Sequence, residues 1–248
     1  MRAFVAMVRV SMRQLLGRKW VILIGLVALL PSVVMVVQTR VQAQGRLPAE
    51  FTQGPLLTLF FFVLPLTSIL LGSLALGEER RDGTLSFLVL RPRRREVITA
   101  AKLTAAWLAA WIICGLSGVL PAVILGISSG VWDMVIPVIV ATGLSTLAYT
   151  GVFMVIGYLT RWAVLIGAAF LCFWETGIAF AADSLANISL FRIGLTAFAG
   201  MVSGAPALLD DAMGSLRPGA GGAVLKCLVI AAVSVGSISL MMRRRDLT

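Results

Sequence analysis

Six long apolar runs, separated by polar segments, constrain the fold of this chain more than any other sequence feature. A helix that crosses a bilayer needs about 20 apolar residues, because the hydrocarbon core is about 30 Å thick and each residue adds about 1.5 Å. With 59% apolar and 13% charged residues, the chain lacks the polar surface of a water-soluble domain. The sequence therefore predicts an all-α integral membrane protein whose six transmembrane helices span residues 20–38, 56–76, 103–127, 135–159, 163–181 and 223–242.

The basic residues fall unevenly on the two sides of these predicted helices. Five Lys and Arg residues precede the first helix, seven lie between the second and third, one lies between the fourth and fifth, and three follow the sixth. The opposite side carries four Arg residues, at positions 40, 46, 192 and 217. The positive-inside rule then places both termini in the cytoplasm. The basic loops are expected to contact anionic lipid, and nucleic-acid binding is not expected because no soluble basic face remains.

Residues 2–18 are interpreted as an amphipathic helix that lies along the inner membrane surface. At about 100° per residue, basic side chains gather on one side of this helix and apolar side chains on the other. A basic, disordered membrane anchor is the alternative interpretation. The basic side holds Arg2, Arg9 and Arg13, and the apolar side holds Phe4, Val8, Met12 and Leu15.

Two absences in the sequence restrict the chemistry that the chain performs alone. It has no histidine, which removes imidazole acid–base catalysis, His-containing triads and His-ligated metals. It has no G-x-x-x-x-G-K-[ST] phosphate loop, and its three cysteines lie far apart in apolar runs with no C-x-x-C pair. We therefore expect no enzymatic activity, no cofactor and no metal site in this chain. Active transport would require a separate polypeptide that binds ATP and Mg²⁺.

A short apolar segment lies on the cytoplasmic side, in the loop over residues 78–95. Gly83 interrupts the preceding helix, Thr84 is suited to cap a new one, and Pro92 ends it. The residues between them are mostly apolar, so a helix formed there must bury one face. It can pack against the ends of the chain's own helices, or it can dock in a groove of a cytoplasmic partner. The residues alone leave both arrangements open.

This segment resembles the inner loop of ABC-2 type transporter permeases, the membrane subunits of ATP-driven exporters. Their pattern runs roughly E-x-x-x-G-T-L-x-x-L-L-x-x-P-x-x-R, followed by a Lys that opens the next helix. The chain departs from it at Arg93, Arg94 and Ala101, which makes the exit of the segment more basic. The stretches Phe173-Trp174-Glu175 and Ser189-Leu190-Phe191-Arg192 are also similar to this family. The inner-loop pattern is matched by Glu79, Gly83, Thr84, Leu85, Leu88, Val89, Pro92, Arg95 and Lys102.

The resemblance implies a single transmembrane domain over residues 1–248 with the ABC-2 fold of type V exporters. It would have an elbow helix at 2–18, a coupling helix within 78–95 and short extracellular helices within 182–222. Two permease chains, as a homodimer or a heterodimer, would join two cytoplasmic ATPase subunits. By alternating access, the complex would export a small molecule, an antibiotic or a lipid across a bacterial cytoplasmic membrane.

The same resemblance implies which residues contact the ATPase. Acidic residues at the start of the loop would pair with basic groups on the partner, and basic residues at its end with acidic groups. Solvent or lipid phosphate is the alternative partner for each of these charges. The expected interface consists of Glu78, Glu79, Gly83, Thr84, Leu85, Phe87, Leu88, Pro92, Arg95 and Lys102.

Among the 11 acidic residues, only Glu175 lies inside an apolar run. Insertion scales assign an acid at the centre of a membrane helix a cost of about 2.5–3.5 kcal/mol, so this carboxyl group should be protonated, paired or facing a cavity. Glu175 and its neighbour Trp174 are candidates for a transport pathway. Alternatively, Glu175 fixes helix packing or meets water where the fifth helix ends, and Trp174 anchors the interface. Residues 182–222 would form an outer lid or a plain cap on the bundle.

Two other classes of function compete with the permease. A secondary transporter or channel usually needs several charged groups inside its membrane helices, and the predicted helices contain one acid. A membrane scaffold for an ATPase would bind the same partner without ATP-driven flux. The identity of the substrate does not follow from the residues.

Overall fold

The computed structural model describes residues 2–17, 19–41, 44–81, 95–178, 189–202 and 219–245. Throughout these ranges the backbone is helical apart from short turns, and they contain no strand. The amino-terminal part comprises α1 (Arg2–Leu16), α2 (Lys19–Val27), α3 (Leu30–Val41), η1 (Gln44–Arg46), α4 (Leu47–Phe51), the π-helical turns η2 (Thr52–Leu56) and η3 (Leu59–Val63), and α5 (Leu64–Arg81). The remainder comprises α7 (Arg95–Ser129), α8 (Val135–Leu159), α9 (Ala163–Phe170), the π-helix η4 (Leu171–Ile178), α12 (Leu190–Ala199) and α14 (Ala220–Arg245).

Within the described ranges, five helical stretches are long and apolar enough to cross a membrane. A further stretch, Ala163–Glu175, is apolar but shorter, and the end of the predicted fifth helix lies outside the described residues. The count of six transmembrane helices therefore stays a prediction. The five stretches are Val21–Val41, Leu47–Gly77, Arg95–Ser129, Val135–Leu159 and Ala220–Arg243.

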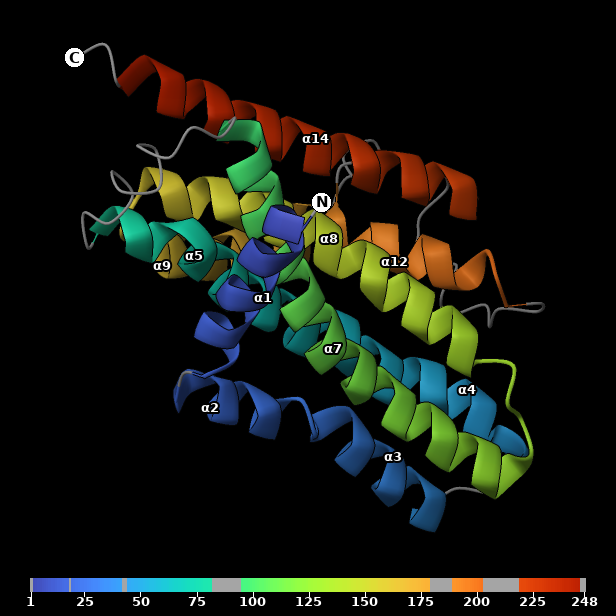
Figure 1. The fold of residues 1–248 in the computed structure, drawn as a ribbon. Coiled ribbons are helices and arrows are strands. Elements are labelled where there is room, and N and C mark those ends of the chain that lie inside the picture. The colour runs from blue at the N-terminus through green and yellow to red at the C-terminus, as the bar shows by residue number, and fades with distance from the viewer. Residues whose placement is uncertain are drawn as a thin grey trace.

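Helix α8 lies at the centre of the bundle and packs against α5, α7, α12 and α14 (Figure 1). Its contact with α5 is a close approach of two backbones. A Cβ atom added to Gly157 would lie 2.5 Å from the carbonyl oxygen of Ser73, and one added to Gly77 would lie 2.8 Å from the carbonyl oxygen of Gly157. Small residues permit such an approach, and van der Waals packing is a main source of helix association in lipid.

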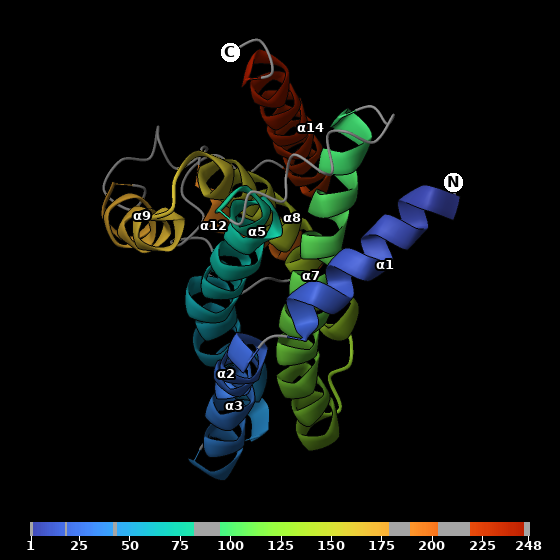
Figure 2. The same ribbon diagram turned by 60° about the vertical axis from the view of Figure 1, so that its left-hand side comes forward.

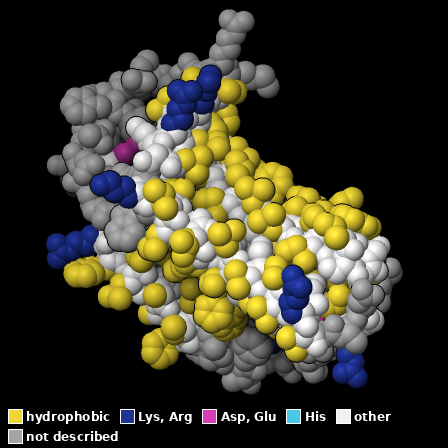
Figure 3. Space-filling view, turned by 90° about the horizontal axis from the view of Figure 1, so that it is seen from below, with side chains coloured by type: hydrophobic (Ala, Val, Ile, Leu, Met, Phe, Trp, Pro, Cys, Tyr) yellow, Lys and Arg dark blue, Asp and Glu magenta, His cyan; other side chains and the backbone are white. Residues whose placement is uncertain are grey.

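The α2–α3 pair and α14 lie at opposite edges of the bundle, as Figures 1 and 2 both show. A break at Ala28 and Leu29, just before Pro31, divides the region predicted as one helix over 20–38 into α2 and α3. Proline has no backbone N–H to donate, and its ring clashes with the preceding turn, which accounts for the break. In each of these two peripheral stretches, only 22% of an apolar 18-residue segment is buried. Their apolar side chains therefore suit contact with lipid, and Figure 3 shows a broad apolar surface on one face of the molecule.

Residues 2–16 form the predicted amino-terminal helix, α1, which packs across α7 (Figure 2). Ser11 and Leu15 are buried in this contact, whereas Val5 and Val10 are exposed. The arrangement agrees with a helix that has two different sides. Its position at a membrane surface, as an elbow helix, stays a prediction.

The helices on both sides of the predicted inner loop are longer than the sequence indicated. Helix α5 continues to Arg81, and α7 begins at Arg95 rather than at the predicted residue 103. Residues 82–94, which contain the apolar centre of the predicted coupling helix, lie outside the described residues.

Candidate functional site

Glu175, on η4, is a buried acid whose carboxylate meets the beginning of α12. Its side chain is 3% exposed. One carboxylate oxygen accepts hydrogen bonds from the backbone N–H of Leu190 at 2.9 Å and of Phe191 at 3.4 Å, and from the Tyr149 hydroxyl at 3.3 Å. The other oxygen accepts a hydrogen bond from Ser189 Oγ at 2.5 Å.

Two side chains, those of Ser189 and Glu175, cap the N-terminus of α12. Ser189 is the N-cap of α12, and its Oγ also accepts a hydrogen bond from the backbone N–H of Arg192 at 3.3 Å. The first N–H groups of a helix have no partner within the helix, and its dipole favours negative charge at this end. The carboxylate and the serine hydroxyl satisfy those N–H groups at a place where every residue of α12 from Leu190 to Phe198 is buried.

A small cavity of about 20 Å³ lies beside this carboxylate. Four of its lining residues are aromatic, and one is the acid itself. The volume is enough for about one water molecule. The cavity is lined by Phe60, Phe61, Pro65, Tyr149, Leu171, Glu175 and Phe191.

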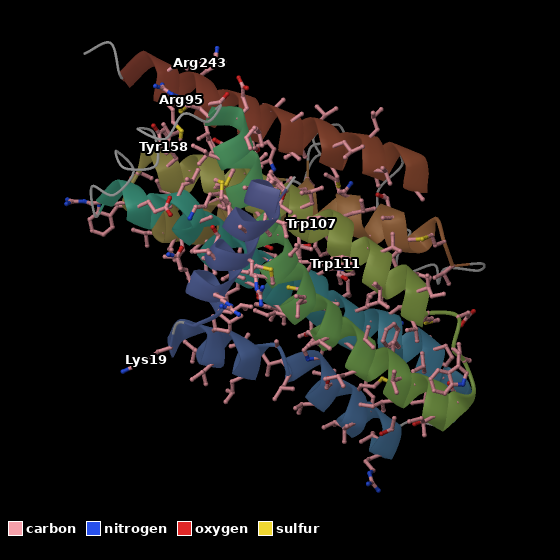
Figure 4. The ribbon with its side chains drawn as sticks, viewed as in Figure 1. Lys19, Arg95, Trp107, Trp111, Tyr158 and Arg243 are labelled. Carbon is pink, nitrogen blue, oxygen red and sulfur yellow. The ribbon has the colours of Figure 1, made fainter. Side chains whose placement is uncertain are left out.

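A second group of charges joins the ends of α5 and α7, next to the predicted coupling segment. Lys102 on α7 forms an ion pair with Glu79 on α5, and the Lys102 side chain is 9% exposed. At the start of α7, Arg95 donates a hydrogen bond from Nη1 to the carbonyl oxygen of Met242 on α14 at 2.5 Å. Glu96 pairs with Arg243 at 2.5 Å in an exposed ion pair. Figure 4 shows Arg95 and Arg243 at the same end of the bundle.

A family model described as "ABC-2 family transporter protein" matches residues 16–173, which is more than half of the chain. The chain belongs to the ABC-2 transporter family. Together with the five apolar stretches, this makes it a multi-pass membrane protein. No curated protein and no solved structure matches the chain.

The matched ABC-2 region contains the ion pair and the loop between α5 and α7, and it ends two residues before Glu175. Glu79 and Lys102, which sequence reasoning assigned to opposite charges on a partner, pair with each other. Glu78 lies on the last turns of α5. The other predicted interface residues, Gly83, Thr84, Leu85, Phe87, Leu88 and Pro92, lie outside the described residues, so the interface stays a prediction.

The two stretches that resemble this family near Glu175 come together in space, because Ser189 and Leu190 donate to Glu175. Sequence reasoning left open whether Glu175 serves transport or packing, and the geometry gives it a packing contact with α12. Trp174 is partly exposed and stacks on Phe170, with ring centroids 6.3 Å apart. Tyr149 was not singled out, although it is one of only two tyrosines in the sequence.

Trp107 and Trp111 on α7 are a further polar feature that sequence reasoning missed. Their rings are parallel, with centroids 5.5 Å apart. The indole N–H of Trp107 donates to the carbonyl oxygen of Gly143 at 2.8 Å, and that of Trp111 donates to the carbonyl oxygen of Ile139 at 3.0 Å. Figure 4 shows both tryptophans on α7. A one-turn spacing of two tryptophans in an apolar run was the available signal.

Among the residues that the structure describes, no cluster of three or more His, Cys, Asp or Glu side chains could hold a metal ion. All three cysteines are free thiols, with Cys114 and Cys227 buried and Cys172 exposed.

Proposed function

We propose that this chain is the permease subunit of an ABC transporter, which forms the substrate pathway and works with a separate ATPase subunit. The match to the ABC-2 family over residues 16–173 carries this proposal. The proposed complex contains two permease chains, as a homodimer or a heterodimer, and exports a small molecule, an antibiotic or a lipid. Its membrane is the bacterial cytoplasmic membrane, with both termini of the chain in the cytoplasm and the basic loops against anionic lipid.

The segment between α5 and α7 is the proposed contact with the ATPase. Its sequence is apolar at the centre, from Leu85 to Leu90, and it connects two helices whose ends are held by charge contacts. The Lys102–Glu79 pair joins α5 to α7, and the contacts of Arg95 and Glu96 join α7 to α14. A displacement of this segment by the ATPase would therefore be transmitted to α5, α7 and α14 together.

ATP hydrolysis is assigned to the partner. The sequence contains no phosphate-binding loop, so we propose that the partner binds ATP and Mg²⁺ and that this chain catalyses no reaction. In the proposed cycle, closure of the ATPase pair shifts the coupling helices and changes which side of the membrane the pathway faces.

Co-purification tests the proposal. A tagged chain, extracted from its native membrane in mild detergent, is expected to bring a nucleotide-binding subunit with it. Leu88→Asp, which places a charge in the apolar segment, should abolish recovery of that subunit. Arg161→Gln, in the predicted cytoplasmic turn between the fourth and fifth helices, is the matched control and should leave it unchanged.

Recovery of the chain without any nucleotide-binding protein would contradict the proposal and favour a secondary transporter or channel. If the ATPase co-purifies but the reconstituted complex drives no flux of any compound from an export profile, the chain is a membrane scaffold for that ATPase. ATP-driven flux that requires both subunits is the result expected for a permease.

A further inference from the structure

The cavity beside Glu175 has the composition of a site for a cation. It combines one carboxylate with the side chains of Phe60, Phe61, Tyr149 and Phe191. The electron-rich face of an aromatic ring attracts a cation, and the attraction grows when the cation loses its water. A carboxylate in such surroundings adds a full opposite charge at short range.

Hydrogen bonds hold both carboxylate oxygens of Glu175 in place. Both of its oxygens act as acceptors, and two of the donors are backbone N–H groups, which cannot accept a proton in return. Hydrogen bonds of this kind offset part of the cost of burying a charged carboxylate. Its four donors are all neutral groups, and no ion pair between described residues includes Glu175. A buried negative charge held in this way is stabilised by a bound cation.

The size of the cavity suits a small head group. A cavity of about 20 Å³ accepts a group the size of one water molecule. The cavity is partly open, so the rest of a ligand can extend out of it. A primary ammonium fits both conditions, because it is compact, carries one charge and donates hydrogen bonds to a carboxylate.

We propose that the cavity lined by Glu175, Tyr149 and three phenylalanines binds the primary ammonium head group of an amine. The proposal deepens the proposed function, on which it rests, because the amine would be a transported substrate or the head group of an aminophospholipid. In both cases the chemistry that the cavity recognises is the same: Glu175 is the counter-ion, and the rings replace part of the water around the charge.

Binding to the purified full chain in a maltoside detergent, which carries no amine, tests this proposal. The thermal unfolding midpoint is measured against methylammonium chloride, with sodium chloride at equal ionic strength as the reference. A ligand that binds only the folded state raises this midpoint in a saturable way. We expect methylammonium to do so and sodium to give only a small, unsaturable change. Equal responses to the two salts would overturn the proposal.

Two variants assign the effect to the cavity. Glu175→Gln keeps a carbonyl acceptor for the N-terminus of α12 but removes the charge, and it should abolish the methylammonium response. Glu50→Gln, at a partly buried acid that accepts a hydrogen bond from Gln38 in another part of the chain, is the matched control and should keep it. If Glu175→Gln does not fold, Phe61→Leu tests the site instead. This variant should need a methylammonium concentration about two to thirty times higher for half-saturation than the unchanged chain, because it removes one aromatic ring. An unchanged response in the folded variants would refute the site.

A second titration distinguishes a lipid head group from a free amine as the ligand. Lysophosphatidylethanolamine is compared with lysophosphatidylglycerol, which has the same chain length and no amine. Stabilisation by the first lipid alone, lost in Glu175→Gln, identifies a lipid head group, whereas stabilisation by methylammonium without a lipid response identifies a free amine. The binding assay needs no ATPase, so a negative result in it does not contradict the permease proposal. Likewise, a failed co-purification does not affect the interpretation of the binding assay.

Discussion

Ser189 Oγ donates a hydrogen bond of 2.5 Å to the carboxylate of Glu175, which lies 14 residues earlier in the chain. The contact connects η4 to the first turn of α12, across a segment whose residues 179–188 lie outside the described part of the structure. Because α12 packs against both α8 and α14, this hydrogen bond connects η4 to a helix that contacts two long helices of the bundle.

Replacing Ser189 by alanine should destabilise the protein. The change removes the N-cap acceptor for the Arg192 N–H and the hydroxyl donor to Glu175, and loss of a serine cap typically costs about 0.5–2 kcal/mol. Unfolding free energy, measured by denaturation in mixed micelles, checks this. Ser237→Ala is the control, because that serine bonds only to a carbonyl within its own helix. Equal losses in the two variants would contradict a capping role.

The close contact between α5 and α8 gives a second prediction. A Cβ atom at Gly157 would lie 2.5 Å from the backbone oxygen of Ser73, so Gly157→Ala must push the two helices apart. Overpacking of this kind costs about 1–3 kcal/mol or more. Gly236→Ala, on α14, meets nothing within 4 Å and should be neutral or slightly stabilising. The ratio of monodisperse to aggregated protein after extraction, with the unfolding midpoint, distinguishes the two.

The apolar runs predicted most of the helices because length and hydropathy alone decide whether a segment can cross a membrane. Val135–Leu159 was predicted as a helix over the same residues that form α8. The break between α2 and α3 was harder to foresee. Proline inside a membrane helix is often tolerated, and whether it breaks the helix depends on neighbours that the sequence does not locate.

The site was less predictable than the fold, since its contacts join residues that are distant in the sequence. A buried acid at position 175 signalled that a partner must exist, but nothing in the sequence identified α12 as that partner. The pairing of Glu79 with Lys102 was missed for a related reason. Both residues were placed in a loop and given an external partner, whereas the longer α5 and α7 bring them together.

The two tryptophans on α7 give a third prediction. Trp107→Phe keeps an aromatic ring but removes the N–H that donates to the Gly143 carbonyl. Hydrogen bonds between membrane helices are worth about 0.6 kcal/mol on average and up to about 1.7. We expect a loss within this range, measured by the unfolding free energy. Trp132→Phe, at an exposed tryptophan, should change stability by less than about 0.5 kcal/mol. A larger effect at Trp132 would count against the hydrogen bond as the cause.

The Lys102–Glu79 and Arg243–Glu96 ion pairs should differ in strength because they differ in exposure. The side chains of Lys102 and Glu79 are 9% and 19% exposed, whereas those of Arg243 and Glu96 are 59% and 44% exposed. Exposed pairs typically contribute about 0.2–1 kcal/mol, since water screens both charges. Removing one partner of a buried pair costs about 3–5 kcal/mol, because the other charge is left uncompensated.

Double-mutant cycles measure this difference. Lys102→Met alone should destabilise the chain more than Lys102→Met combined with Glu79→Gln, because the single variant takes the Lys102 charge away from a mostly buried carboxylate. The cycle for Arg243→Gln and Glu96→Gln should give a coupling energy below about 1 kcal/mol that falls further at high salt. If the coupling energies of the two cycles are equal, burial does not set the strength of these pairs, and the Lys102–Glu79 contact is not the stronger of the connections that hold the coupling segment in place.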